Sequence, residues 1–125
     1  MIPNRGWIII TLLTALGGCG PYSLPSTPLF VGVEGHSYAQ GSRLIQDRLI
    51  ARFPTGSSVR ELTAYLERQG LRIEPASPSS KPNSGVASFK YGGTICGSQV
   101  RVSWEGDAAA KVKGIHALYA DTGCL

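Results

Sequence analysis

The side chains best suited to nucleophilic, redox or metal chemistry are three cysteines and two histidines: Cys19, Cys96, Cys124, His36 and His116. Neither histidine has a second ligand at a spacing typical of a metal site. The sequence has no Gly-x-Ser-x-Gly turn, no Cys-x-x-Cys pair and no glycine-rich loop ending in Lys-Ser/Thr. It therefore predicts no catalytic residues, no metal ligands and no cofactor. The remaining chemistry is that of the three thiols.

The first eighteen residues have the layout of a secretory signal peptide. Arg5 supplies a positive charge, and a largely apolar run of about ten residues follows from Trp7 to Leu16. A membrane-spanning helix needs roughly 20 apolar residues, whereas about ten suit the apolar region of a signal peptide. Residues 1–18 are therefore predicted to be a leader that is removed.

The segment Leu16-Gly17-Gly18-Cys19 resembles the lipobox of bacterial lipoproteins. In that motif the cysteine thiol is alkylated by a diacylglyceryl group, and the chain is cut before the cysteine. The resemblance implies that Cys19 is lipidated and anchors the mature protein to a membrane without spanning it. In enterobacteria-like sorting, Asp directly after the lipidated cysteine retains a lipoprotein in the inner membrane. This chain has Gly20 there, which favours an outer-membrane location facing the periplasm. The alternative is a buried N-terminal helix that happens to contain a cysteine.

The composition is that of one small globular domain. The chain has 125 residues, of which 42% are hydrophobic and 16% charged, with a formal net charge of +4. It is too apolar for a disordered chain and too weakly basic for a typical nucleic-acid-binding protein. Residues 37–125 are predicted to form the domain. Residues 19–36, rich in proline and glycine, are predicted to be the lipidated cysteine and a flexible tether. The alternative is that Leu29-Phe30-Val31 docks as a short edge strand.

A first amphipathic helix is predicted over residues 42–53. Ile45, Leu49 and Phe53 recur every four residues, Ser42 is a candidate N-cap, and Pro54 ends the helix.

A second helix is predicted to begin at Val59. Ser58 and Glu61 have the spacing of a capping box, and Gly70 is placed as a left-handed C-terminal cap.

Three strands are predicted over residues 86–91, 99–105 and 111–120, with a bulge at Gly114. Leu71-Arg72-Ile73 is expected to be a short extended piece, and residues 74–85 a flexible loop. The order of elements predicts an α+β fold, in which two helices pack on a three-stranded antiparallel sheet.

Cys96 and Cys124 are the pair left once Cys19 carries lipid. In an oxidising compartment they are expected to form a disulfide. Because Cys124 follows the last predicted strand, the chain is expected to turn back at Asp121-Thr122-Gly123 to reach Cys96.

The exposed side of the strands is predicted to carry basic side chains with two aromatic residues nearby. Two interpretations stay open: a binding surface for an anionic lipid, peptidoglycan or a protein, or a solvated face that resists aggregation. The residues concerned are Lys90, Arg101, Lys111, Lys113, Trp104 and Tyr119.

The stretch Gly56–Leu66 is similar to the helix-opening segment of the SmpA/OmlA family of small outer-membrane lipoproteins. The resemblance implies a lipobox, a capped helix, two helices on a three-stranded antiparallel sheet, and an accessory role of the kind one member has in β-barrel assembly. The family usually ends this helix with a Leu-Gly-x-Pro turn, whereas here Leu66 is followed by Glu67-Arg68-Gln69-Gly70. The matching residues are Gly56, Ser58, Glu61, Leu62 and Leu66.

These features together predict a non-enzymatic periplasmic lipoprotein that acts as an interaction or accessory module of the cell envelope. Its expected partners are the membrane, through the lipid anchor, and an envelope protein, with no nucleic acid. The alternative is an inhibitor or immunity-type lipoprotein that blocks an envelope enzyme. An enzyme would require His116 near a carboxylate and a Ser or Thr hydroxyl in a cleft.

Overall fold

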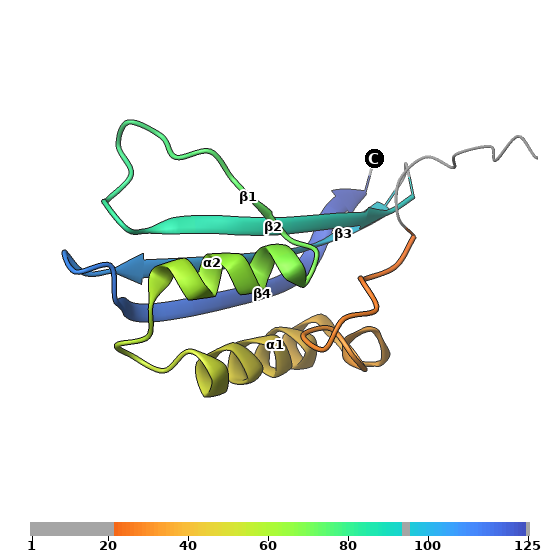
Figure 1. Cartoon of the computed structure of the whole chain (residues 1–125). Helices are drawn as coiled ribbons and strands as arrows, with labels where there is room; N and C mark the ends of the chain where they lie inside the picture. The colour runs from red at the N-terminus through yellow and green to blue at the C-terminus, as the bar shows by residue number, and fades with distance from the viewer. Residues whose placement is uncertain (1–21, 94–95, 125) are drawn as a thin grey trace, which may run out of the picture.

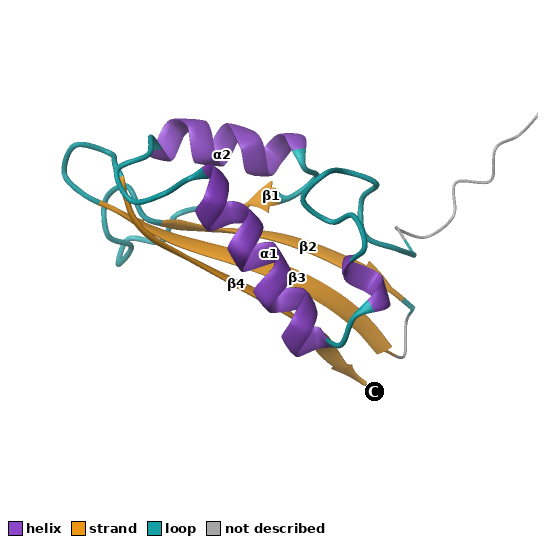
Figure 2. Cartoon of the chain, turned by 90° about the horizontal axis from the view of Figure 1, so that it is seen from below, coloured by secondary structure: helices purple, strands orange, loops and turns teal. Residues whose placement is uncertain are grey.

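The computed structural model describes residues 22–93 and 96–124 (Figure 1), so the predicted leader, residues 1–18, and Cys19 lie outside the described residues. Two helices cover one face of an antiparallel sheet of strand order β1-β2-β3-β4 (Figure 2). The fold is therefore α+β, as predicted. The elements are η1 (Val33–Gly35), α1 (Tyr38–Arg52), α2 (Val59–Arg68), β1 (Arg72–Ile73), β2 (Gly85–Gly92), β3 (Cys96–Gly106) and β4 (Val112–Cys124).

The sheet has four strands where three were predicted. The short extended piece after α2 is β1, in which Arg72 lies opposite Ser88 and Ile73 opposite Ala87. The pairing continues one residue further, where the Glu74 backbone N–H donates to the Val86 carbonyl at 2.8 Å. The sequence predicted the extended conformation but not its pairing with β2, because two residues are too few to show an alternating pattern.

Strict alternation in the central strand places the core on one side of the sheet. Val100, Val102 and Trp104 of β3 are buried. Arg101, between the two valines, and Glu105, directly after Trp104, are exposed. Since cross-strand partners share a face, the register extends this division to the neighbouring strands. The core-facing partners of β3 include Ala87 and Phe89 on β2 and Ile115, Ala117 and Tyr119 on β4.

Helix α1 begins four residues before the predicted start, and its N-cap is Ser37 rather than Ser42. The Ser37 hydroxyl accepts a hydrogen bond from the Gln40 backbone N–H at 3.2 Å. The first turn includes Gly41, which is buried against the Tyr119 ring. Gly41 is a poor helix former in isolation, and it is kept because a side chain there would collide with that ring.

Two polar side chains of α1 occupy the outer edge of β4. The Gln46 side-chain amide donates to the Ile115 carbonyl at 3.0 Å and accepts from the Ala117 backbone N–H at 2.6 Å. One turn earlier, the Ser42 hydroxyl accepts from the Tyr119 N–H at 2.8 Å and donates to the Tyr119 carbonyl at 3.1 Å. These side chains bind the outward backbone groups in the middle of β4, as a further strand would, and hinder pairing with another chain there.

Helix α2 has both predicted caps. The Ser58 hydroxyl accepts from the Glu61 N–H at 3.3 Å, and the chain leaves the helix through Gly70 at φ +104°. The Leu71 N–H then donates to the Leu66 carbonyl at 3.0 Å, which leads the chain directly into β1.

The prediction of a flexible tether is wrong for residues 22–36, which belong to the folded domain. Leu29, Phe30 and Val33 are at most 3% exposed and complete the core between the helices and the sheet. The segment is held by the Gln69 side chain, which accepts from the Leu29 N–H at 2.9 Å. It is a series of turns ending in η1, so the alternative of an edge strand is wrong as well. The prolines exclude helix and strand, yet they do not prevent the apolar side chains from docking.

Replacing Gly41 by alanine should destabilise the domain although alanine favours helix. A Cβ at this position would lie 2.6 Å from a Tyr119 ring carbon and 3.2 Å from Val33. Overpacking of this kind costs about 1–3 kcal/mol, more than the gain of about 1 kcal/mol in helix propensity. Urea unfolding followed by circular dichroism measures the difference. The control is Gly35→Ala, where a Cβ meets nothing within 4 Å; equal stability of the two variants would contradict the packing described here.

Replacing Gln46 by leucine should expose the edge of β4. The Ile115 carbonyl and the Ala117 N–H would lose their partner, at a cost of about 1–3 kcal/mol in the free energy of unfolding. We also expect concentration-dependent self-association in sedimentation velocity, because an unpaired edge can pair with another copy. Gln40→Leu, an exposed position on the same helix, is the control and should remain stable and monomeric.

Candidate interaction face

The face of the sheet turned away from the helices is the candidate functional surface. The register sets Arg72, Ser88, Arg101 and Leu118 side by side in one row across the four strands. Lys90 follows Ser88 by two residues on β2 and therefore lies on the same face. We call Arg72, Ser88, Lys90 and Arg101 the open-face cluster.

The open-face cluster carries more positive charge than its neighbours neutralise. Arg101 lies 3.5 Å from the Glu74 carboxylate, in a pair whose side chains are 47% and 39% exposed. Within the described residues, neither Arg72 nor Lys90 forms an ion pair. Because an exposed ion pair contributes little, the Glu74–Arg101 contact is easily exchanged for another anion. The cluster is therefore suited to bind anionic groups.

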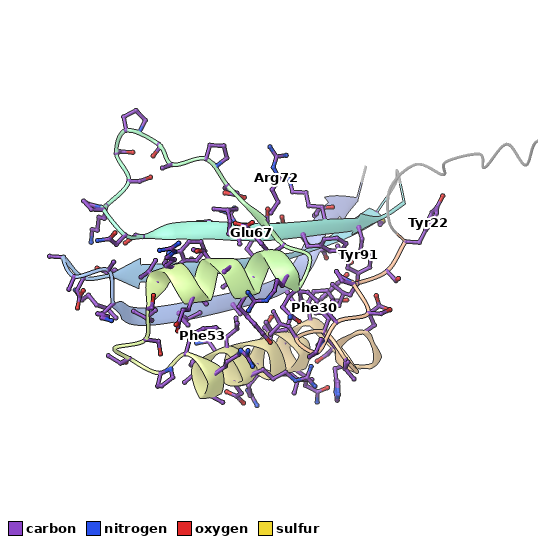
Figure 3. All side chains as sticks on the ribbon, viewed as in Figure 1. Tyr22, Phe30, Phe53, Glu67, Arg72 and Tyr91 are labelled. Carbon is purple, nitrogen blue, oxygen red and sulfur yellow. The ribbon has the colours of Figure 1, made fainter. Side chains whose placement is uncertain are left out.

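A surface depression of about 410 Å³ lies at the β1 and β2 side of the cluster. Arg72, Ser88 and Lys90 line it together with Glu74. Ser88, whose hydroxyl can donate or accept, lies between Arg72 and Arg101 in the register. Figure 3 shows Arg72 on the side of the sheet opposite the helices.

A second ion cluster lies further along the same face. Glu105 interacts with Lys113 at 3.6 Å and with Lys81 at 3.7 Å. This carboxylate is shared between two lysines, so the excess charge there is smaller than around Arg72 and Lys90.

Three of the residues expected on or near this face lie elsewhere. Trp104 and Tyr119 are 6% and 5% exposed and face the helices. Lys111 lies in the turn before β4, where its backbone N–H donates to the Asp107 carboxylate at 2.9 Å. Trp104 lies an even number of residues from Val100 and Val102, so the alternation of the strand already indicates that it faces the core. The face on which Tyr119 lies is set by the irregular pairing at the start of β4. Conversely, Arg72 was missed because the sequence did not predict that its short extended piece pairs with β2.

A network of tyrosine hydroxyls joins α1 to the core side of the sheet. The Tyr38 hydroxyl lies 2.7 Å from the Ser98 hydroxyl, and Tyr91 and Tyr119 share a hydrogen bond between their hydroxyls. Burial, reinforced by the Tyr91 hydrogen bond, raises the pKa of Tyr119 well above its usual value. These contacts hold the start of α1 against one end of the sheet, where Tyr91 lies opposite Ser98.

The two histidines lie on different elements of the fold. His36 is exposed directly after η1, and His116 is exposed on the open face, where its backbone carbonyl accepts a long 3.5 Å contact from the Ser103 hydroxyl. In the described part of the chain, no group of three His, Cys, Asp or Glu side chains is placed to hold a metal ion. Across the same residues, no helix has the length and apolar character needed to cross a membrane.

The predicted turn at Asp121-Thr122-Gly123 is wrong, because β4 continues as a strand to Cys124. The register places Cys124 directly opposite Cys96, and Cys96 is disulfide-bonded. Opposite residues of an antiparallel pair have Cα atoms about 4.5–5.5 Å apart, which suits a disulfide. The Cys124 side chain is outside the described part, so the Cys96–Cys124 bond stays a prediction that the register supports.

Comparisons with known proteins give no relative for this chain: no family, no curated protein and no solved structure matches it.

If Cys96 and Cys124 are bonded, reduction should lower the free energy of unfolding by about 3–4 kcal/mol, because the bond closes a loop of about 29 residues. Urea unfolding with and without a thiol reductant measures this difference. A Cys96→Ser/Cys124→Ser double variant should have the same lowered free energy of unfolding with and without the reductant. Alkylation of both thiols under native, non-reducing conditions would contradict the bond.

Proposed function

We propose that this protein is a non-enzymatic lipoprotein, anchored through Cys19, whose domain acts as an interaction module at the surface of the envelope membrane. The observation that carries the proposal is the lipobox-like segment Leu16–Cys19 at the end of a charged and then apolar N-terminus. Two or three acyl chains on one residue give stable anchoring, because each buried methylene contributes about 0.8 kcal/mol.

The geometry of the domain supports a role at the membrane. Leu24 already belongs to the core, with only 6% of its surface exposed. The chain between Cys19 and Leu24 is therefore all that separates the proposed anchor from the folded domain. At about 3.3–3.6 Å per residue, that segment reaches roughly 17 Å. An anchored domain would therefore stay close to the bilayer rather than extend far into the periplasm.

The open-face cluster supports a role in binding rather than catalysis. It places Arg72, Lys90 and Ser88 around a surface depression of about 410 Å³. Such a surface recognises negative charge by complementarity. We propose that it is the contact surface of the module, with an anionic component of the envelope as its ligand.

The SmpA/OmlA resemblance is compatible with this proposal and adds an outer-membrane location to it. The resemblance implies two helices on a three-stranded antiparallel sheet, and this chain has two helices on one face of a four-stranded one. Membership of the family and a part in barrel assembly remain predictions.

Lipidation is tested by metabolic labelling with radioactive palmitate in a Gram-negative host. The wild-type chain should incorporate label and fractionate with membranes, while Cys19→Ala should incorporate none. Ser23→Ala is the control, because it changes an exposed residue outside the lipobox and should leave labelling unchanged. Equal labelling of the wild type and Cys19→Ala, or an uncut and unlabelled wild-type chain, would refute the anchor.

A further inference from the structure

We infer that the open-face cluster binds the anionic phospholipid headgroups of the membrane that carries the anchor, so that the sheet lies against the bilayer and the helices face away. The inference rests on the proposed function for the presence of the anchor. It adds that the ligand is an anionic lipid headgroup, that the domain is oriented with its sheet against the membrane, and that the open-face cluster sets both.

The first argument is charge. Arg72, Lys90 and Arg101 lie together on one face with Glu74 as the nearby carboxylate, and Arg72 and Lys90 have no ion pair among the described residues. Each cation close to an anionic membrane surface favours binding on the order of fivefold, and the attraction fades within a Debye length. Glu74 can leave Arg101 at little cost because their pair is exposed.

The second argument is the shape and chemistry of the face. The row that contains Arg72, Ser88 and Arg101 ends in Leu118, whose side chain is 44% exposed. The depression of about 410 Å³ lies at the opposite end of this row, where Arg72, Ser88 and Lys90 line it and could surround a phosphate. A phosphate could accept from Ser88 and the flanking cations, while Leu118 would meet the apolar part of the interface.

The third argument is where the chain leaves the domain. Figure 3 shows Tyr22 at the end of the sheet, and its side chain is 74% exposed. With an anchor no more than about 17 Å of chain from Leu24, the domain stays close to the bilayer, where charges attract within a Debye length of about 8 Å at physiological salt. Tethering also gives the surrounding headgroups a high effective concentration around the face.

An acidic protein segment would match the same charges. The membrane is favoured because the short anchor keeps it permanently within reach, whereas nothing in the fold selects a particular protein. The two occupants are separated by the experiment below.

The experiment uses the chain from Gly20 onward, which retains all the described residues and lacks both the apolar leader and Cys19. Its outcome therefore does not depend on lipidation. Binding is measured by sedimentation with vesicles of phosphatidylcholine alone or with phosphatidylglycerol added, at low salt. We expect binding to the anionic vesicles only.

The decisive comparison is between two variants that lose the same charge. Arg72→Gln/Lys90→Gln should reduce the partition coefficient on the order of 25-fold, since each cation contributes on the order of fivefold. Arg43→Gln/Arg60→Gln removes two exposed arginines from the helices and should reduce it less than about threefold. Circular dichroism checks that both variants are folded.

Equal loss in the two variants, or no binding to anionic vesicles, would overturn the inference. So would binding of a fluorescent hexaglutamate peptide that depends on Arg72 and Lys90 while vesicles fail to bind, because the occupant would then be an acidic protein segment. Failure of palmitate labelling with vesicle binding intact would refute the anchor alone.

Discussion

The sheet buries one of its faces, and the rest of the structure depends on that constraint. Val100 and Val102 are completely buried on the helix side, and the residues between and beside them must then face the opposite way. Successive side chains of a strand point to opposite faces of the sheet, and residues paired across strands share a face. The alternation of β3 therefore decides which residues of β1, β2 and β4 face the helices. The same constraint that builds the core therefore assembles Arg72, Ser88 and Arg101 into one row from three separate strands.

Hydrogen bonding explains why α1 lies where it does. An edge strand leaves half of its backbone groups without a partner, and Gln46 and Ser42 supply partners for the β4 groups at Ile115, Ala117 and Tyr119. Helix α1 is thus fixed along β4 by polar contacts as well as by its buried Ile45 and Leu49. With this edge covered, the exposed face is the large surface that the sheet leaves open for contact.

The N-terminal segment links the fold to the proposed location. Leu24, Leu29 and Phe30 complete the core, so the domain begins within a few residues of the expected anchor. A long tether would let the domain rotate freely, whereas a short one limits which surfaces come near the bilayer. The proposed orientation follows from this limit together with the charge of the open face.

The amino-acid sequence alone determined the α+β class, α2 with its caps at Ser58 and Gly70, and the two faces of β3, because these depend on local periodicity and capping. Tertiary structure decided what depends on distant partners. Arg72 joins the candidate site only because Ser88 pairs with it, Gly41 is tolerated in α1 only because Tyr119 fills the space, and residues 22–36 fold only because the helices and sheet offer them an apolar surface. Such contacts join residues far apart in the chain, and no local pattern records them.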